Sequence, residues 1–365
     1  MKLIFTCGGT SGHVSPALAI AEEIKSIDPE CEILFICREN GYENKPILKN
    51  GYDIKYLNVR GIERRITTKN IKSIALALSA EKAARRIISD FKADAVVGTG
   101  GYVCWPVLHA ANSMKIPTIL HESNAVAGLV TRLLAKRTTR VILNAEECAK
   151  YLKRKDNVCV LGNPLSKKFY TVSRKSARKK LKIADSDFYI LSYGGSGGAQ
   201  KMNEVIADVI KLYSSKEPGV KHLHATGARY FKIYGQVQHK NCRIVPYIEN
   251  MHEHLAAADV VICRCGAMTL SEIEAVGTPA ILIPSPNVTD NHQYENGRVL
   301  EKRGTALMIE EKNLDKNSLI KAINDVKNSK KGTETQILAR KNRADLKSRE
   351  KIVKEVLRIA NHGRA

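Results

Sequence analysis

Two copies of one local pattern limit the folds that are open to this chain: a short apolar run, a turn rich in glycine, and an amphipathic stretch. In the first copy, residues 3–7 lead into the turn 8–13, and Ser15 and Pro16 then have the chemistry of a helix start. In the second copy, residues 188–193 lead into the turn 194–198 and an amphipathic stretch follows. Strands and helices that alternate in this way indicate parallel sheets covered by helices. The pattern therefore predicts an α/β fold with two similar halves.

The rest of the chain extends this plan. Further short apolar runs are strand candidates, with helical patterns between most of them: residues 31–37, 95–97, 118–120 and 140–143. The segment 163–182 contains Pro164 and eight Lys or Arg residues, as expected of a linker. We predict an N-terminal domain over 1–162 and a C-terminal domain over 163–336. A final amphipathic helix within 337–365 could return to either domain, and the N-terminal one is the partner we expect.

The composition places the chain in the cytoplasm. Of its 365 residues, 44% are hydrophobic and 26% charged, which is ordinary for a globular protein. No apolar run approaches the ~18 residues of a membrane-spanning helix, and Gly8 interrupts the apolar start too early for a secretion signal. Nine cysteines in mostly apolar surroundings favour buried thiols in a reducing compartment. Cys263 and Cys265 match no zinc spacing, so we expect no metal site.

The charge is strongly positive and calls for an anionic partner. Lys and Arg number 59 against 37 Asp and Glu, a formal net charge of +22. Nucleic acid, an anionic membrane surface and an anionic substrate are all candidates. No helix-turn-helix, zinc-finger or RNP-type signature accompanies the charge, so we expect no nucleic acid partner.

The stretch from Arg60 to Arg86 holds eight basic and two acidic residues, and it has one apolar stripe. Ile71, Ile74, Ala75 and Leu78 recur at helical spacing. This pattern is typical either of core packing beneath a solvated basic face or of a shallow contact with anionic lipid headgroups.

The glycine turns are candidate anion sites. A glycine turn between a strand and a helix exposes backbone N–H groups and the positive end of the helix dipole. Two such turns suit a nucleotide diphosphate, although tight packing alone would also explain them. The first turn does not fit G-x-G-x-x-G, and no Gly-Lys-Ser/Thr follows either turn. Dehydrogenase and P-loop functions are therefore excluded.

Eight motifs, in one order and spacing, closely resemble the MurG family over Met1 to roughly Glu310. They are Gly8-Gly9-Thr10-Ser11-Gly12-His13-Val14-Ser15-Pro16-Ala17-Leu18-Ala19, Gly98-Thr99-Gly100-Gly101-Tyr102, His121-Glu122-Ser123-Asn124 with Gly128, Gly162-Asn163-Pro164, Gly194-Gly195-Ser196-Gly197-Gly198-Ala199, Pro246-Tyr247-Ile248-Glu249-Asn250-Met251, Arg264-Cys265-Gly266-Ala267-Met268-Thr269-Leu270-Ser271-Glu272 and Asp290-Asn291-His292-Gln293.

The resemblance implies a fold and a reaction. The fold is the GT-B architecture, with two Rossmann-like domains facing across a cleft. The reaction is inverting transfer of N-acetylglucosamine from UDP-N-acetylglucosamine to the C4 hydroxyl of lipid I, undecaprenyl-pyrophosphoryl-N-acetylmuramoyl-pentapeptide. The product is lipid II for peptidoglycan and cell wall synthesis, and no cofactor is required. The resemblance also implies a peripheral enzyme at the cytoplasmic face of the cell membrane, with anionic inner-leaflet lipids as partners.

The resemblance also assigns residues. Ser196 and Ala267 to Thr269 would face the donor diphosphate, Glu272 the ribose hydroxyls, and Ile248 the uracil, while Gln293 and Asn124 would hold the sugar. The full donor set is Thr10, Ser11, Gly12, Asn124, Ser196, Ile248, Ala267, Met268, Thr269, Leu270, Ser271, Glu272 and Gln293. The acceptor set is Gly9, Gly100, Gly101 and Tyr102.

His13 is the catalytic candidate. Direct attack by the acceptor hydroxyl needs a base, and imidazole has a suitable pKa range at neutral pH. His13 either removes the proton or orients the acceptor; the simpler interpretation is a local hydrogen bond at a helix start. For Glu272 the simpler interpretation is a solvated carboxylate in the first turn of a helix. His121 and Glu122 are expected to support the loop that carries Asn124.

Two positions depart from the family. Ser11 replaces the usual glycine, so we expect no positive φ there. Ser166 stands where the family's motif usually has arginine, and the adjacent Lys167 would supply a point charge in place of a bidentate fork.

Two other functional classes remain open. A UDP-sugar epimerase or hydrolase on the same scaffold would need no lipid contact. A non-catalytic protein that binds nucleotides or nucleic acid is favoured only by the charge.

Overall fold

The computed structural model describes residues 1–41, 43–61, 68–236, 239–328 and 347–362, and it divides the chain into two compact units. The first unit is Met1–Leu165 together with Leu346–Ala365, and the second is Ser166–Asp345. The chain thus passes from one unit to the other between Leu165 and Ser166, three residues after the predicted position.

The first unit is built on a seven-stranded parallel sheet of order β3-β2-β1-β4-β5-β6-β7. Its strands are β1 (Lys2–Thr6), β2 (Glu32–Arg38), β3 (Asp53–Leu57), β4 (Ala95–Gly98), β5 (Thr118–Glu122), β6 (Arg140–Leu143) and β7 (Val158–Val160). Its helices are α1 (Ser11–Ile27), α2 (Asn44–Lys49), α3 (Thr68–Phe91), α4 (Cys104–Ser113), α5 (Leu129–Leu134) and α15 (Lys347–His362), with a 3-10 turn at Glu146–Tyr151. The strand order reverses between β1 and β4, the position at which open parallel sheets bind ligands.

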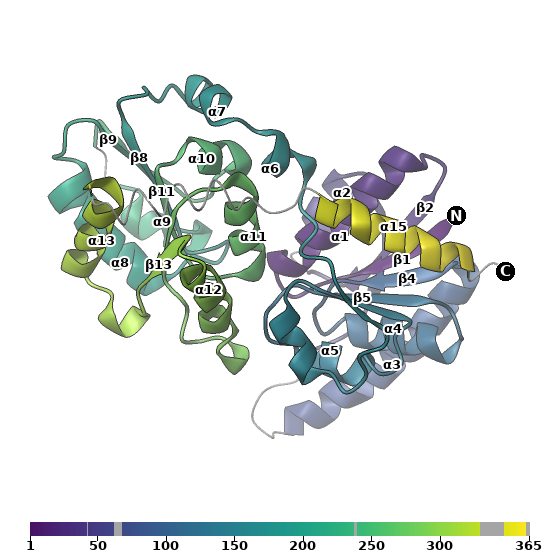
Figure 1. The fold of residues 1–365 in the computed structure, drawn as a ribbon. Helices are drawn as coiled ribbons and strands as arrows, with labels where there is room; N and C mark the ends of the chain where they lie inside the picture. The colour runs from purple at the N-terminus through teal and green to yellow at the C-terminus, as the bar shows by residue number, and fades with distance from the viewer. Residues whose placement is uncertain (42, 62–67, 237–238, 329–346, 363–365) are drawn as a thin grey trace. The chain divides into compact units, whose positions relative to one another are not determined.

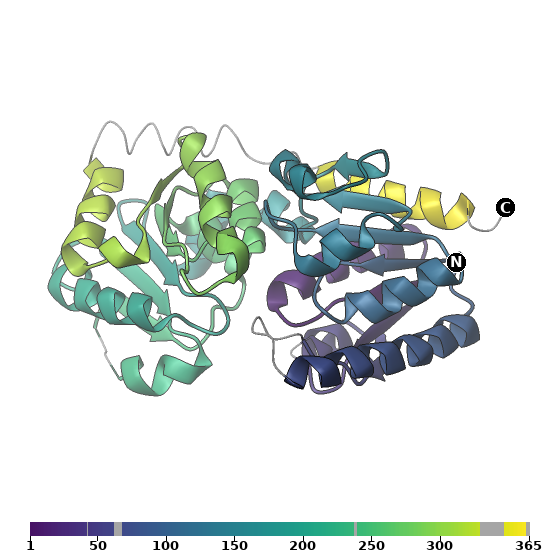
Figure 2. The ribbon, with the colours of Figure 1, turned by 90° about the horizontal axis from the view of Figure 1, so that it is seen from below.

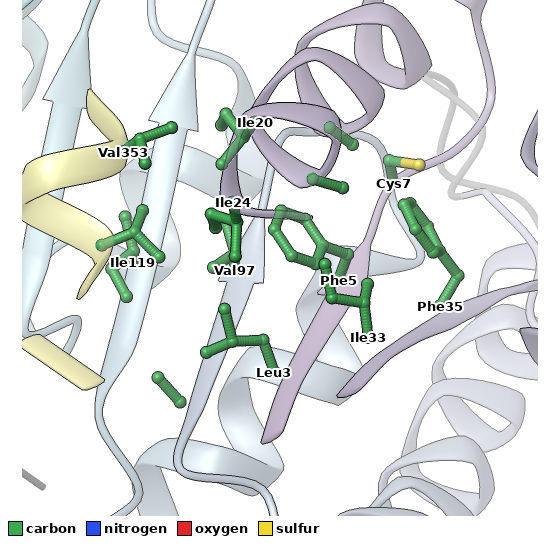
Figure 3. Packing of buried hydrophobic residues seen from close by; sticks show 14 of the residues in the cluster. Leu3, Phe5, Cys7, Ile20, Ile24, Ile33, Phe35, Val97, Ile119 and Val353 are labelled. Atoms are coloured by element: carbon green, nitrogen blue, oxygen red, sulfur yellow. The ribbon is translucent and has the colours of Figure 1, made fainter. Parts of the chain in front are cut away.

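One face of this sheet packs against α1 and α15. Leu3, Phe5 and their neighbours on the sheet contact Ile20 and Ile24 of α1, and α15 adds Val353 (Figure 3). The rings of Phe5 and Phe35 stack with centroids 5.4 Å apart. Four Ile and Val residues of α15 are buried in this cluster: Ile352, Val353, Val356 and Ile359. Because fully burying one such side chain contributes roughly 1.5–3 kcal/mol, these contacts stabilise the packing of the C-terminal helix on the sheet.

Helices α3 and α4 cover the other face of the same sheet. Alternate strand residues such as Ile4 and Val96 point to this side, and they pack against Ala84 and Ile88 of α3. Figure 2 shows α3 and α15 on opposite sides of this unit. Residues 62–67 of the basic stretch lie outside the described residues, as do the side chains of Ile71, Lys72 and Ile74.

The second unit repeats the plan with a six-stranded parallel sheet of order β10-β9-β8-β11-β12-β13 (Figure 1). Its strands are β8 (Phe188–Tyr193), β9 (Val220–Ala225), β10 (Cys242–Val245), β11 (Val260–Cys263), β12 (Ala280–Leu282) and β13 (Ala306–Met308). Its helices are α6 (Lys167–Thr171), α7 (Arg174–Leu181), α8 (Gln200–Val209), α9 (Ala228–Tyr234), α10 (Met251–Ala257), α11 (Ala267–Val276), α12 (His292–Lys302) and α13 (Lys316–Asn328). A π-helical turn, Ile210–Ser214, continues α8, and 3-10 turns cover Thr289–Asn291 and Glu311–Asn313. The predicted pair of parallel α/β halves is confirmed.

Both faces of the second sheet are covered as well. Leu191 and Val261 pack on the side of α10 and α11, whereas Ile190 and Ile262 pack on the side of α8 and α13. Within the described ranges, no helix is long and apolar enough to cross a bilayer.

Candidate functional site

The two glycine turns of the first unit meet at the switch point of its sheet. The Gly8 N–H donates to the Gly100 carbonyl over 3.3 Å, which ties the turn after β1 to the turn after β4. The Tyr102 ring lies beside Gly9. The structure therefore brings together all four predicted acceptor residues, Gly9, Gly100, Gly101 and Tyr102.

His13 lies against these turns at the start of α1. Its Nδ1 is 2.9 Å from the Gly8 carbonyl oxygen, which can only accept, so Nδ1 carries the proton. The Thr10 hydroxyl oxygen is 3.2 Å from the same nitrogen. The neutral ring then keeps a lone pair on Nε2, the form that a base requires. A Cβ atom on Gly100 would lie 2.5 Å from His13 Cδ2 and 2.9 Å from Nε2, so only glycine leaves room for this ring.

Ser11 is the first residue of α1 and is therefore in a right-handed helical conformation. Glycine's freedom to adopt positive φ is thus not needed at this position, as expected from the departure from the family pattern.

The loop after β5 is held by the buried carboxylate of Glu122. Its Oε1 accepts from the Asn124 backbone N–H at 3.1 Å and from Asn124 Nδ2 at 3.0 Å. Its Oε2 accepts from Gly128 N–H at 3.0 Å and from the Thr131 hydroxyl at 2.6 Å. Because four donors converge on one carboxylate, Glu122 fixes the position and orientation of Asn124.

His121 precedes this loop and is fully buried. Its Nε2 donates to the Gly162 carbonyl at 3.1 Å. Burial holds the pKa of His121 below its ordinary value, although the hydrogen bond to Gly162 and the charge of Glu122 act in the opposite direction. His121 is therefore a neutral side chain that ties the loop to the end of the unit.

In the second unit, the turn 194–198 forms one wall of a pocket of about 560 Å³. Ser196 is exposed on this turn. The pocket is lined by Gly194, Gly198, Ala199, Gln200, Lys201, Glu204, Tyr230, Arg264, Ser285, Asn287, Gln293 and Glu311. Gln293 Oε1 accepts from the Ser285 backbone N–H at 2.9 Å, which orients the side-chain amide and leaves its NH2 group to donate elsewhere.

Helix α11 begins directly after Gly266, three residues beyond the end of β11, and carries most of the remaining predicted donor residues. Ala267, Met268, Leu270 and Ser271 are buried, and Thr269 is half-buried. Leu270 packs in the core of this unit, so its side chain is not available to a polar ligand. The free N–H groups of the first turn make the start of α11 a suitable place for a phosphate.

Glu272 is half-buried one helical turn further on. Burial raises the pKa of its carboxyl group to about 8. Ile248 is buried and packs in the same apolar cluster as Leu270 and Ile273, which lie on either side of Glu272 in α11. The structure thus places Glu272 near the segment 246–251, which contains Ile248, the residue expected to contact the uracil.

Several pocket residues were not predicted from the sequence. Arg264 Nη1 donates to the carbonyls of Ile283 and Pro284, both at 3.2 Å, and its Nη2 pairs with Glu311. Arg264 lies within a motif that the sequence analysis quoted, so its position was a usable signal. Glu311 lies outside every motif. Lys167, at the start of α6, is exposed in the second unit.

Comparisons with known proteins agree with this arrangement. The glycosyltransferase family 28 N-terminal domain matches residues 3–143, and the glycosyltransferase family 28 C-terminal domain matches residues 189–356. A relative from Acetivibrio thermocellus is 45% identical over 318 residues, 86% of each chain, and one from Alkaliphilus metalliredigens is 37% identical over 363 residues, 98% of this chain and 99% of that one. Both carry the name UDP-N-acetylglucosamine–N-acetylmuramyl-(pentapeptide) pyrophosphoryl-undecaprenol N-acetylglucosamine transferase.

Solved structures extend the comparison. The crystal structure of Acinetobacter baumannii MurG matches with a TM-score of 0.75 at 25% identity, covering 98% of this chain and 99% of that one. A UDP complex of MnaA from S. aureus, 15% identical, has a TM-score of 0.71 over 99% of this chain and 97% of that one, a likeness of fold alone. The two family domains and these relatives cover nearly the whole sequence, and the chain therefore belongs to the MurG family of glycosyltransferase family 28.

Proposed function

We propose that this chain transfers N-acetylglucosamine from UDP-N-acetylglucosamine to the C4 hydroxyl of lipid I, forming lipid II with inversion at the anomeric carbon. The observation that carries the proposal is the 37% identity, over 98% of the chain, to a relative named for this transfer. Each unit of the structure contributes a set of groups that suits one of the two substrates.

On the donor side, the second unit supplies the groups that an anionic nucleotide needs. The turn 194–198 and the start of α11 offer backbone N–H groups to the diphosphate. Glu272 accepts the two ribose O–H groups, and the backbone of Ile248 reads the uracil. Gln293 donates through its NH2 group to oxygen atoms of the sugar, because Ser285 already occupies its carbonyl oxygen.

On the acceptor side, His13 acts as the base. The C4 hydroxyl of the acceptor gives its proton to Nε2 as its oxygen forms a bond to the anomeric carbon. The bond from that carbon to the UDP oxygen breaks, and UDP departs with the electron pair. Backbone N–H groups stabilise the negative charge that develops on the departing diphosphate.

The protein reaches its lipid substrate, in this proposal, as a peripheral enzyme at the cytoplasmic face of the membrane. The basic stretch 60–86 would contact anionic lipids. Support comes from Leu78, which is 57% exposed on α3, whereas core packing would bury it. Helix α5, which packs on α4 as α3 does, also exposes Leu129 and Leu133.

One incubation distinguishes this function from its alternatives. The protein is mixed with labelled UDP-N-acetylglucosamine, with and without a short-chain analogue of lipid I. Transfer of label to the analogue supports the proposal. UDP release or epimerisation without acceptor indicates a hydrolase or epimerase, and no turnover indicates a protein that only binds.

A further inference from the structure

A row of five polar side chains crosses the interior of the second unit. It runs between the sheet and α8, where the surrounding side chains are apolar. Each of the five is at most 2% exposed: Ser192 of β8, Asn203 of α8, Ser214 of the π-helical turn, and His222 and His224 of β9. No assigned role in the donor or acceptor site uses any of them.

One end of the row lies near the turn 194–198, called the donor turn below, and this end fixes the direction of the hydrogen bonds along the row. Asn203 Nδ2 is 3.0 Å from the Thr226 carbonyl oxygen, so the amide donates there and its Oδ1 faces the other way. His224 Nε2 lies 3.2 Å from that Oδ1 and must donate to it. Burial lowers the pKa of His224 to about 4, so the ring is neutral near pH 7 and its Nδ1 accepts.

The hydrogen bonds keep the same donor-to-acceptor direction as far as Ser214, at the other end of the row. His224 Nδ1 lies 2.8 Å from the Ser192 hydroxyl and 3.2 Å from the Ser192 carbonyl oxygen. Because the proton of this neutral ring is on Nε2, Nδ1 accepts from the hydroxyl, which is the closer of the two groups. The hydroxyl oxygen of Ser192 then accepts from His222 Nε2, also at 2.8 Å. His222 Nδ1 accepts from the Ser214 hydroxyl at 3.0 Å. Burial lowers the pKa of His222 to about 3, so this ring is neutral as well. The five bonds thus form one directed chain from Ser214 to the Thr226 carbonyl.

The backbone of the donor turn packs against the Thr226 carbonyl. Gly198 has φ +71°, and a Cβ atom at this position would overlap the Thr226 carbonyl oxygen. Asn203 lies in the first turn of α8, which follows the turn 194–198 directly, and its N–H makes the first intrahelical bond, to the Ala199 carbonyl at 2.9 Å. Gly198 and Ala199 both line the pocket. The side chain of Asn203 therefore holds the carbonyl that the backbone of Gly198 approaches.

We propose that this chain of hydrogen bonds positions the turn 194–198 for the diphosphate of the donor, with Asn203 and His224 as positioning residues. The inference rests on the proposed function. A purely structural role would be served as well by apolar side chains, because buried polar groups carry a desolvation cost. The chain of hydrogen bonds instead ends at the Thr226 carbonyl, which the backbone of Gly198 approaches closely.

The test compares Asn203→Ala with Thr278→Ala. Thr278 is a matched control in the same unit, because its buried hydroxyl donates to the Leu255 carbonyl at 2.8 Å, away from the pocket. UDP affinity is measured by calorimetry, donor and acceptor KM by transfer assays, and Tm by melting. We expect Asn203→Ala to weaken UDP binding and raise donor KM about tenfold, with acceptor KM unchanged. Thr278→Ala should lower Tm while UDP affinity and both KM values stay within about twofold of wild type.

A second pair of variants keeps the test decisive if Asn203→Ala does not fold. Gln can donate and accept like the neutral ring, so His224→Gln should bind UDP nearly as well as wild type, whereas His224→Ala should bind about tenfold more weakly. Wild-type UDP affinity in Asn203→Ala, or equal affinity in the two His224 variants, overturns the inference alone. A wild-type protein that binds no UDP overturns the proposed function and the inference with it.

Discussion

The ionisation of Glu272 should control donor affinity. Burial raises the pKa of this carboxyl group from 4.5 to about 8, so most of the unliganded protein holds it protonated at pH 7. Ribose hydroxyls donate hydrogen bonds, and they bind the carboxylate better than the acid. Affinity for UDP-N-acetylglucosamine should therefore rise as pH rises through 8. If only the ionised form binds well, the rise from pH 7 to pH 9 is about tenfold, with a plateau above.

The same pKa predicts how pH changes stability. The folded pKa lies above the unfolded one, so wild type loses stability as pH rises from about 4.5 towards 8. The loss is about 1.4 kcal/mol per pH unit at most, and Glu272→Gln should not show it. At pH 9, where wild type is mostly ionised, that variant should bind the donor ~10-fold or more weakly than wild type, because a hydrogen bond to a charged group contributes roughly 1.5–3 kcal/mol.

Calorimetry with UDP-N-acetylglucosamine in the absence of acceptor checks the two expectations on affinity, because the doubly esterified diphosphate of this donor does not titrate between pH 7 and 9. Titrations in two buffers of different ionisation enthalpy count the proton released on binding. Glu272→Gln is the control: it retains only the small effect of the uracil N3–H, which begins to ionise at the upper end of this range. Melting of both proteins across the same pH range checks the expectation on stability. Binding to wild type that releases no proton and is equally tight at pH 7 and pH 9 would refute the reasoning. So would equal affinity for the 2′-deoxyribose analogue.

Three further predictions concern the first unit. His13→Ala should lower turnover by about 10²–10⁴ and leave donor affinity nearly unchanged in calorimetry; an unchanged rate would remove His13 from the chemistry. Gly100→Ala should lower kcat similarly and also lower Tm, because the new Cβ meets the His13 ring at a φ of +112°; a variant with wild-type kcat would contradict this. Leu78→Ser should reduce sedimentation with anionic vesicles at constant Tm, whereas the equally exposed Ile27→Ser should not. A large fall in Tm for Leu78→Ser would favour core packing.

The fold was predictable where the signal is local. A strand that runs into glycine and then into an amphipathic helix is readable from about 20 consecutive residues, and the order of such units implies a parallel sheet. The position of His13 followed in the same way, because it directly follows the first turn.

Contacts between distant residues left no such signal. Arg264 and Glu311 pair across 47 positions, and nothing near Glu311 in the sequence marks it as a pocket residue. The amphipathic pattern of α15 showed that the helix has an apolar face but not which unit it covers. The stripe that includes Leu78 has the spacing of a core-facing helix, yet Leu78 is exposed, because periodicity reports amphipathicity and not what lies against the apolar face.

The glycine residues explain why the turns could be predicted from the sequence, whereas the chain of hydrogen bonds next to the turn 194–198 could not. At Gly100 and at Gly198 another part of the protein occupies the space that a Cβ atom would need: the His13 ring in the first unit, and the Thr226 carbonyl in the second. A close approach of this kind restricts a position to one residue type, so it is visible in a single sequence. The hydrogen bonds that hold Thr226 in place use serine, asparagine and histidine, which are ordinary in any strand or helix. The sequence therefore shows the positions at which the backbone must approach another part of the protein closely. Only the structure shows which hydrogen bonds hold that part of the protein in place.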